Sequence, residues 1–283
     1  MSDFTQLFRD DFSGSDLNYG IWKAQYSGQY GNGMFRWDPA QLEVSDGKLI
    51  IATEREGAGW VSGGLSTIPD GQTYGSYEFR ARMDPGQGTA GVILLWPSDN
   101  QWTDEVDIVE THRAGRESFA FSNHGDPNVT QYIDVDVSQW HDYRLDWTPG
   151  SLKLYVDGVE KGNISTDVPS QKMSLGAQGI VLGADEHWFG GAPDGSTPGR
   201  VEMEIDWVKV SAYTPGAGDA ESAAPTAASD APVSTQVGVT PSAMVAETSS
   251  DPWARFMVNG QIDWQAAAAH VAANYEATGQ WFI

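Results

Sequence analysis

Three carboxylates alternate with β-branched residues between Glu105 and Glu110, where the chain reads Glu-Val-Asp-Ile-Val-Glu. Val and Ile fit a pleated surface, so this stretch is predicted to be a strand. Side chains of a regular strand alternate between two faces, which would place Glu105 and Asp107 on one face and Glu110 on the other. One extra residue, a β-bulge at Ile108 or Val109, would return Glu110 to the acidic face and the apolar pair to the core.

Acids gathered on one strand face suit the hydrolysis of glycosidic bonds with retention. One carboxylate attacks the anomeric carbon and the other protonates the leaving oxygen, with the carboxyl groups roughly 5 to 5.5 Å apart. The backbones of Glu105 and Glu110 are about 13 Å apart at ~3.3 Å per residue, so a concave sheet is required. Asp107 lies between them and could share a proton with Glu105. The alternative is a solvated acidic strand, although repulsion between neighbouring like charges argues against it.

Aromatic residues surround this stretch: Trp96, Trp102, Trp140, Trp147 and Trp188. Trp offers a large apolar face with a polar handle, on which the C–H faces of a sugar can stack. The alternative for each Trp is a place in the core or at its rim. We expect Trp102 to form a wall of a sugar cleft and Trp147 to lie in the core.

Short alternating runs separated by turn residues extend from Gly63 to Val210, without helical periodicity. This pattern predicts a β-sandwich or barrel. A first strand is expected within Leu7–Phe12, and Asp46-Gly47 predicts a hairpin turn. The loop Tyr26–Trp37 is rich in glycine and aromatic residues, which indicates either the rim of a glycan cleft or a structural Ω-loop.

The formal net charge of −23 argues against nucleic acid or anionic membrane surfaces as partners, and a neutral polysaccharide is compatible with it. The 283-residue chain contains no cysteine, which excludes disulfide bonds and thiolate metal sites. Residues Met1–Thr5 lack the basic start and apolar run of a secretory signal, and no stretch is long enough to span a bilayer.

Composition changes at Thr214, and the chain divides there into a β-sandwich (1–213), a linker (214–250) and a C-terminal segment (251–283). The linker is rich in Ala, Ser, Thr and Pro and lacks aromatic residues, so it is predicted to be disordered. Asp263, an Ala-rich run and Gly279 predict a short helix in the last segment. That segment could dock on the sandwich, bind a partner or act as a C-terminal export signal.

The stretch Glu105–Glu110 resembles the Glu-x-Asp-x-x-Glu signature of glycoside hydrolase family 16, in the bulged form of its laminarinase-like members. Further segments resemble motifs of that family in the same order along the chain, from about Phe8 to Tyr213. These segments are Tyr74–Arg82, Leu95–Pro97, Trp140–Pro149, Leu154–Gly158 and Glu204–Val210.

The resemblance implies an all-β fold, a two-sheet antiparallel jelly roll similar to concanavalin A with a concave cleft. It also implies Glu105 as nucleophile, Glu110 as general acid and base, and Asp107 as an assisting carboxylate. The implied sugar-binding residues are Trp96, Trp102, His124 and Trp188. For His124, a structural hydrogen-bonded role is the alternative.

No cofactor is implied for catalysis, but the resemblance raises a structural calcium. Its ligands here would be Asp11, the carbonyl of Gly47 and Asp206, since oxygen ligands suit a hard cation. The alternative is that these are ordinary solvated or capping acids.

The function implied is that of a secreted, monomeric, retaining endo-β-glycanase acting on β-1,3 or mixed β-1,3-1,4 glucan. Two departures leave the exact glycan open: Thr89–Leu94 replaces the Trp-Pro-Ala run of many laminarinases, and Asp104 replaces a glycine. The alternatives are an endoglycanase for another polysaccharide, such as a bacterial exopolysaccharide or an algal galactan, and a carbohydrate-binding sandwich without catalysis.

Overall fold

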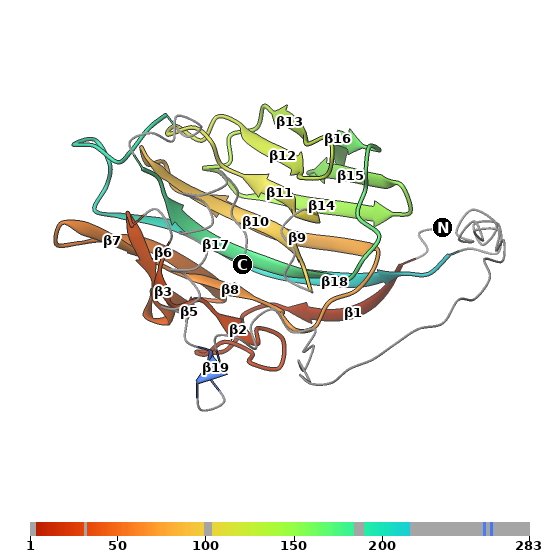
Figure 1. The fold of residues 1–283 in the computed structure, drawn as a ribbon, viewed down its shortest axis with the longest axis horizontal. Helices are drawn as coiled ribbons and strands as arrows, with labels where there is room; N and C mark the ends of the chain where they lie inside the picture. The colour runs from red at the N-terminus through yellow and green to blue at the C-terminus, as the bar shows by residue number, and fades with distance from the viewer. Residues whose placement is uncertain are drawn as a thin grey trace, which may run out of the picture.

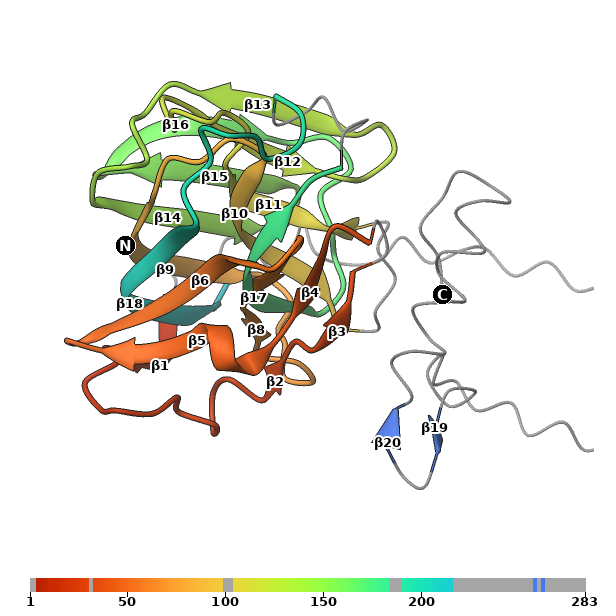
Figure 2. The same ribbon diagram turned by 90° about the vertical axis from the view of Figure 1, so that its left-hand side faces the viewer.

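A computed structural model describes residues 4–30, 33–98, 104–183 and 190–215, and the backbone of 257–258 and 261–262. The described chain forms two packed sheets (Figure 1), and Figure 2 shows the layer of β14, β9 and β18 beside the layer of β10, β11 and β17. The predicted all-β jelly-roll sandwich is confirmed.

The first sheet has eleven described strands. In spatial order they are β16 (Val159–Ile164), β15 (Ser151–Val156), β14 (His141–Thr148), β9 (Gly75–Met83), β18 (Arg200–Tyr213), β6 (Lys48–Glu56), β7 (Gly59–Ser62), β4 (Phe35–Trp37) and β3 (Gly28–Gln29), with β1 (Phe4–Asp10) on β18 and β5 (Leu42–Ser45) on β6. All pairs are antiparallel except β4 with β7.

The second sheet has seven described strands and carries the acidic stretch. In spatial order they are β13 (Val129–Ile133), β12 (Phe119–Asn123), β11 (Val106–Glu110), β10 (Thr89–Pro97), β17 (Met173–Val181), β8 (Gly64–Ser66) and β2 (Ala24–Gln25). A short 3₁₀ helix, η1 (Pro39–Gln41), and a two-strand pair, β19 (Met257–Val258) with β20 (Gln261–Ile262), complete the described elements.

The core lies between the two sheets and follows from side-chain alternation. Tyr77 and Phe79 of β9 point inward and are buried, whereas Glu78 and Arg80 point outward. Phe79 stacks on Tyr143 of β14 with ring centroids 5.2 Å apart.

Trp147 lies at 0% exposure in this core and donates a hydrogen bond from Nε1 to the carbonyl of Pro169 at 3.0 Å. Its ring also meets Tyr74 edge-on, with centroids 5.2 Å apart. The prediction that Trp147 is a core residue is confirmed.

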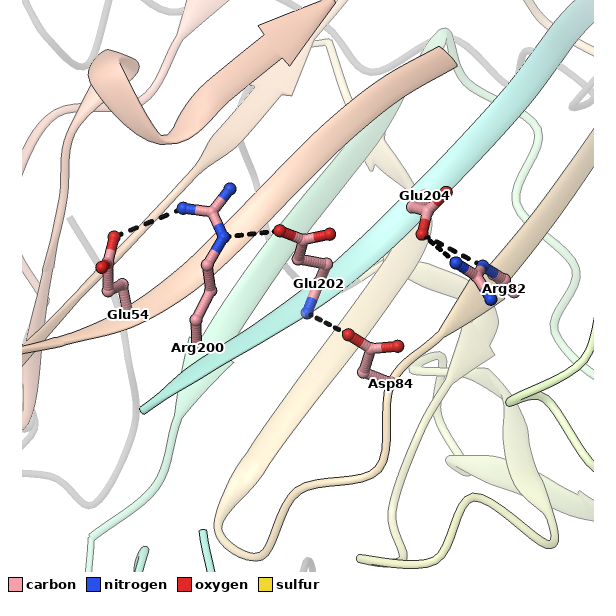
Figure 3. A network of polar contacts seen from close by, with 6 residues as sticks. All are labelled: Glu54, Arg82, Asp84, Arg200, Glu202 and Glu204. Carbon is pink, nitrogen blue, oxygen red and sulfur yellow. Dashed lines mark hydrogen bonds and ion pairs between the residues drawn. The ribbon is translucent and has the colours of Figure 1, made fainter. Parts of the chain in front are cut away.

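Charged side chains of β6, β9 and β18 form a network of polar contacts on the outward face of the eleven-stranded sheet (Figure 3). Arg200 on β18 bridges Glu54 on β6 and its own neighbour Glu202, and Arg82 on β9 pairs with Glu204, whose side chain is only 5% exposed. Lys48 approaches the second oxygen of Glu204 at 2.7 Å. These pairs let a buried acid remain charged, because two cations flank it.

Turn predictions are confirmed where glycine supplies a positive φ. The Asp46-Gly47 turn between β5 and β6 has φ values of 51° and 71°, and Asp157-Gly158 between β15 and β16 has 50° and 77°. Such values at both central positions are those of a type I′ turn, whose twist matches that of the flanking strands.

Two expectations differ from the structure or lie outside it. The first strand begins at Phe4 and ends at Asp10 rather than spanning Leu7–Phe12, because Phe12 adopts a φ of 46° and turns into the core. The predicted linker beyond 215 and the helix between Asp263 and Gly279 lie outside the described residues. The described residues form no helix that is long and apolar enough to span a membrane.

We expect the substitution Trp147→Ala to lower the free energy of unfolding by about 3–5 kcal/mol, because it leaves a cavity in the core and removes the partner of the Pro169 carbonyl. Val159→Ala, at a side chain that is 57% exposed, should change it by no more than about 0.5 kcal/mol. Urea unfolding of both variants checks this. Equal effects of the two substitutions would contradict the assignment of Trp147 to the core.

Candidate active site

A one-residue bulge interrupts β11 between Asp107 and Glu110. On the β10 side, Ile93 pairs with Val109 and the next residue, Leu94, pairs with Asp107, so Ile108 is the extra residue. On the β12 side the register also shifts between Asp107 and Glu110. The predicted bulge is confirmed.

The bulge has the predicted effect on the side chains. Ile108 and Val109 both lie at 0% exposure in the core between the sheets, whereas Glu110 is half-buried and pairs with Val92 and Ala120. Burying two successive apolar side chains provides the driving force for the irregularity, since a regular strand would expose one of them.

Strand register then places the three acids in successive rows on the outward face of the seven-stranded sheet. Asp107 faces Leu94 on β10, and Glu110 faces Val92 two residues further along the same strand. Glu105 precedes Val106, the partner of Leu95, and so falls beside Trp96. All three carboxylates therefore share one surface.

Glu105 is half-buried, and its pKa is raised well above the ordinary value for a glutamate. Removal of water from its carboxyl is the first cause, and the charges of Asp107 and Glu110 add to it. The charges of both neighbouring acids therefore reach the carboxyl of Glu105.

Tyr26, just after β2, also reaches this site. Burial raises the pKa of its phenol to about 12, opposed by the side chain of Ser66 and reinforced by the charge of Glu105. Its ring lies directly over Gly64, where an added Cβ would come within 2.4 Å of it. A glycine at this position therefore leaves the space that the Tyr26 ring occupies.

Asp107 is held by His124, which directly follows β12. The Nε2 atom of His124 lies 2.7 Å from Oδ2 of Asp107, and these side chains are 20% and 5% exposed. The backbone N–H of His124 donates to the carbonyl of Glu105 at 2.9 Å. His124 is thus tied to two members of the acidic group.

Asn128 determines which nitrogen of His124 carries the proton. Its Nδ2 lies 3.1 Å from Nδ1 of His124, and an amide nitrogen only donates, so Nδ1 accepts and Nε2 donates to Asp107. Thr130 donates to Oδ1 of Asn128 at 3.4 Å and lies 3.0 Å from the hydroxyl of Ser122. The donors of this hydrogen-bond chain point toward Asp107 and fix the orientation of its carboxyl group.

The remaining predicted site residues are distributed as follows. Trp96 is half-buried on β10, in the row of Glu105, which suits a residue beside the acids. Trp102 and Trp188 lie outside the described residues. The roles assigned to Trp96, Trp102, His124 and Trp188 stay predictions.

The proposed calcium ligands are partly engaged by cations. Asp11 pairs with Arg9 at 2.6 Å, and Asp206 faces Arg80 at 3.6 Å. Over the described ranges, no three acidic, His or Cys side chains gather as a metal site would require. This donor set fits arginine partners better than a calcium ion, and the calcium stays a prediction.

Two residues near the acids escaped the sequence reasoning. The sequence places Tyr26 in a loop that is expected either at the rim of a glycan cleft or as a structural Ω-loop, and it gives no sign of the approach of Tyr26 to Glu105. Asn128 carried no signal in the sequence, because its contact with His124 forms within the turn between β12 and β13 and belongs to no motif.

The chain matches the family model described as glycosyl hydrolases family 16 over residues 29–209. It is 27% identical to endo-1,3-1,4-beta-glycanase EglC of Rhizobium meliloti over 72% of this chain and 51% of that protein. It is 31% identical to a beta-glucanase of Acetivibrio thermocellus over 61% of this chain and 53% of that protein. The chain therefore spans about half the length of these relatives.

Solved structures share the fold. An endo-beta-1,3-glucanase from Pyrococcus furiosus has a TM-score of 0.66 and 20% identity, covering 75% of this chain and 96% of that one. The laminarinase catalytic domain from Thermotoga petrophila has a TM-score of 0.66 and 19% identity, covering 76% and 100%. Because the sequence identity to both structures is low, these similarities establish the architecture of the chain alone.

We expect ¹⁵N NMR to show His124 with its proton on Nε2. The substitution Asn128→Leu should weaken this tautomer preference, because it removes the donor to Nδ1. Thr130→Val should weaken it to a smaller extent and Thr130→Ser should preserve it, since serine keeps the hydroxyl. A proton on Nδ1 in the unmodified protein would contradict the hydrogen-bond chain.

The raised pKa of Glu105 predicts how the stability of the protein depends on pH. The folded protein holds this proton more tightly than the unfolded chain, so the stability present below about pH 4 is lost as the pH rises through the raised pKa. Glu105→Gln cannot lose a proton there. The melting temperature of Glu105→Gln should match that of the wild type at low pH and exceed it at pH 8. Each kcal/mol of unfolding free energy that the wild type loses corresponds to a difference of about 2–4 °C.

The matched control is Glu160→Gln, at an exposed position on β16. It should show no such divergence between low and high pH. Parallel curves for Glu105→Gln and the wild type would show that the carboxyl of Glu105 is not held in the protonated form by its surroundings.

Proposed function

The chain belongs to glycosyl hydrolases family 16, and from this premise we propose that it is a retaining endo-β-glycanase. Its substrate would be a β-1,3 or mixed β-1,3-1,4 glucan, cleaved by double displacement. The observation that carries the proposal is the bulge at Ile108, which gathers Glu105, Asp107 and Glu110 on one surface.

In the first step Glu105 reacts in its ionised form, which is populated above its raised pKa. One of its carboxylate oxygens bonds to the anomeric carbon while the bond from that carbon to the bridging oxygen breaks. Glu110 gives its proton to the departing oxygen, which leaves as a hydroxyl of the released sugar. In the second step, Glu110 takes a proton from water, whose oxygen displaces Glu105 from the anomeric carbon.

Asp107 would serve as a positioning residue between the two glutamates. It is nearly buried, accepts a hydrogen bond from His124, and its charge raises the pKa of Glu105. A fixed negative charge beside the nucleophile also favours the positive charge that develops on the sugar ring in an oxocarbenium-like transition state.

The choice of glucan rests on charge and on the relatives. A strongly acidic chain disfavours a sulfated galactan, because such a polymer would be repelled. Relatives carry the names endo-1,3-1,4-beta-glycanase and beta-glucanase. An endoglycanase for a bacterial exopolysaccharide is the second candidate, because the departures at Thr89–Leu94 and Asp104 leave the exact glycan open.

Secretion, a monomeric state and a role of residues 251–283 in export belong to the same proposal. The strongly negative net charge and the sparse Lys and Arg support work in solution on a neutral polymer. Export is tested by removing residues 251–283 and assaying the culture medium for the protein. Unchanged export would rule out a role of this segment.

We expect the protein to release reducing ends from laminarin and mixed-linkage β-glucan, with the β-anomer appearing first in ¹H NMR. Glu105→Gln should remove activity on every substrate. Glu110→Gln should lose about 10²–10⁴-fold on polymer but retain the first step on an aryl β-glycoside, whose leaving group needs no proton. Glu160→Gln is the control and should remain active.

Two results would redirect the proposal. Activity confined to an exopolysaccharide in a panel of purified glycans would favour the second candidate. Binding of glucans without release of reducing ends from any glycan would favour a non-catalytic sandwich.

A further inference from the structure

The positions of the acids determine the path of a bound polymer. Glu105 directly precedes β11 and Glu110 ends it, so a sugar chain between them must cross β11 above Asp107 and continue over the neighbouring strands on both sides. On one side it meets β12 and β13, which form the edge of the seven-stranded sheet.

The β12–β13 side carries no charge. The two strands read Phe-Ala-Phe-Ser-Asn and Val-Thr-Gln-Tyr-Ile, without an acidic or basic residue, in a chain whose net charge is −23. In the row of Asp107 lie Ser122 and Thr130, and in the row of Glu110 lie Ala120 and Tyr132. The outward surface therefore offers the half-exposed side chain of Thr130 and one aromatic ring beside the acids.

Tyr132 is the exposed aromatic of this edge, with 56% of its surface accessible. Its ring centroid lies 5.0 Å from that of His112, at an interplanar angle of 55°. His112 follows Glu110 by two residues and is itself 7% exposed, with Nε2 lying 3.4 Å from the hydroxyl of Ser118. A buried ring thus supports the exposed one.

The support is uncharged under ordinary conditions. Burial lowers the pKa of His112, and the neighbouring Arg113 lowers it further, so the imidazole is neutral at neutral pH. A neutral ring beside Tyr132 neither attracts an anion nor repels a neutral ligand. This contrasts with the acidic group one row away.

We propose that Tyr132, supported by His112, forms a subsite that binds a pyranose ring of the polysaccharide on the β13 side of the cleaved bond. The inference rests on the proposed function. Register places Tyr132 two strands from Glu110, about 10 Å at the usual spacing of strands. That position lies beyond the sugar whose oxygen Glu110 would protonate, so the ring would bind there without taking part in the chemistry.

The chemistry of this edge selects a sugar over other ligands. A pyranose ring presents an apolar C–H face for Tyr132 and hydroxyl groups for the half-exposed Thr130, whereas Ser122 is buried beneath it. A phosphate or an acidic peptide would find no cation on β12 or β13. A large hydrophobic partner would cover the half-exposed Thr130 and leave its hydroxyl without water.

The test measures binding of laminarihexaose and a mixed-linkage hexasaccharide to Glu105→Gln by calorimetry. Adding Tyr132→Ala should weaken binding about 3- to 10-fold, the range expected for one aromatic stacking contact. Tyr132→Trp should retain binding. Tyr19→Ala, which removes a ring that is 63% exposed in the loop between β1 and β2, is the matched control and should have no effect.

In the active enzyme, Tyr132→Ala should raise KM for the polymer and leave kcat nearly unchanged, since the ring binds without contacting the reacting atoms. Unaltered binding and KM in Tyr132→Ala, with normal binding by Glu105→Gln, would overturn the subsite and leave the proposed function standing. Failure of Glu105→Gln to bind either oligosaccharide, together with an inactive wild type, would overturn both.

Discussion

The twofold alternation of side chains along a strand is the constraint on which this site depends. It would place Glu105 and Glu110 on opposite faces, and one extra residue at Ile108 puts them on the same one. The same residue sends Ile108 and Val109 together into the core, where both are fully buried. The arrangement of the acids and the packing of the core are therefore one structural event, and neither can be changed without the other.

Electrostatics opposes this arrangement, and the surroundings compensate for it. Three carboxylates on one surface repel one another, and burial adds to the penalty, as the raised pKa of Glu105 shows. Hydrogen bonds offset this repulsion at Asp107, which accepts a hydrogen bond from Nε2 of His124. Asn128 donates a hydrogen bond to Nδ1, the other ring nitrogen of His124. Asp107 is thus held in place by hydrogen bonds, and its charge contributes to the raised pKa of Glu105.

Much of this could be predicted from local patterns, and the rest could not for a physical reason. The strand, its bulge, the Asp46-Gly47 turn and the burial of Trp147 each follow from nearby residues. The approach of Tyr26 to Glu105 depends on the pairing of β2 with β8 at the far edge of the sheet. Such contacts arise from sheet order, which alternation and turn residues within one segment do not specify.

The two sides of β11 differ in how the outward surface is filled. Toward β17 and β8, glycines at 64 and 176 leave room for the ring and hydroxyl of Tyr26, which occupy the sheet surface beside Glu105. Toward β13, the side chains of Ala120 and Ser122 are small, so no bulky side chain stands in these rows between β11 and Tyr132. The first side therefore presents a protein ring close to the acids, and the second presents one further away. Under the proposed function, a polymer that crosses β11 would pass over both sides, and this difference would distinguish the two directions of the bound chain.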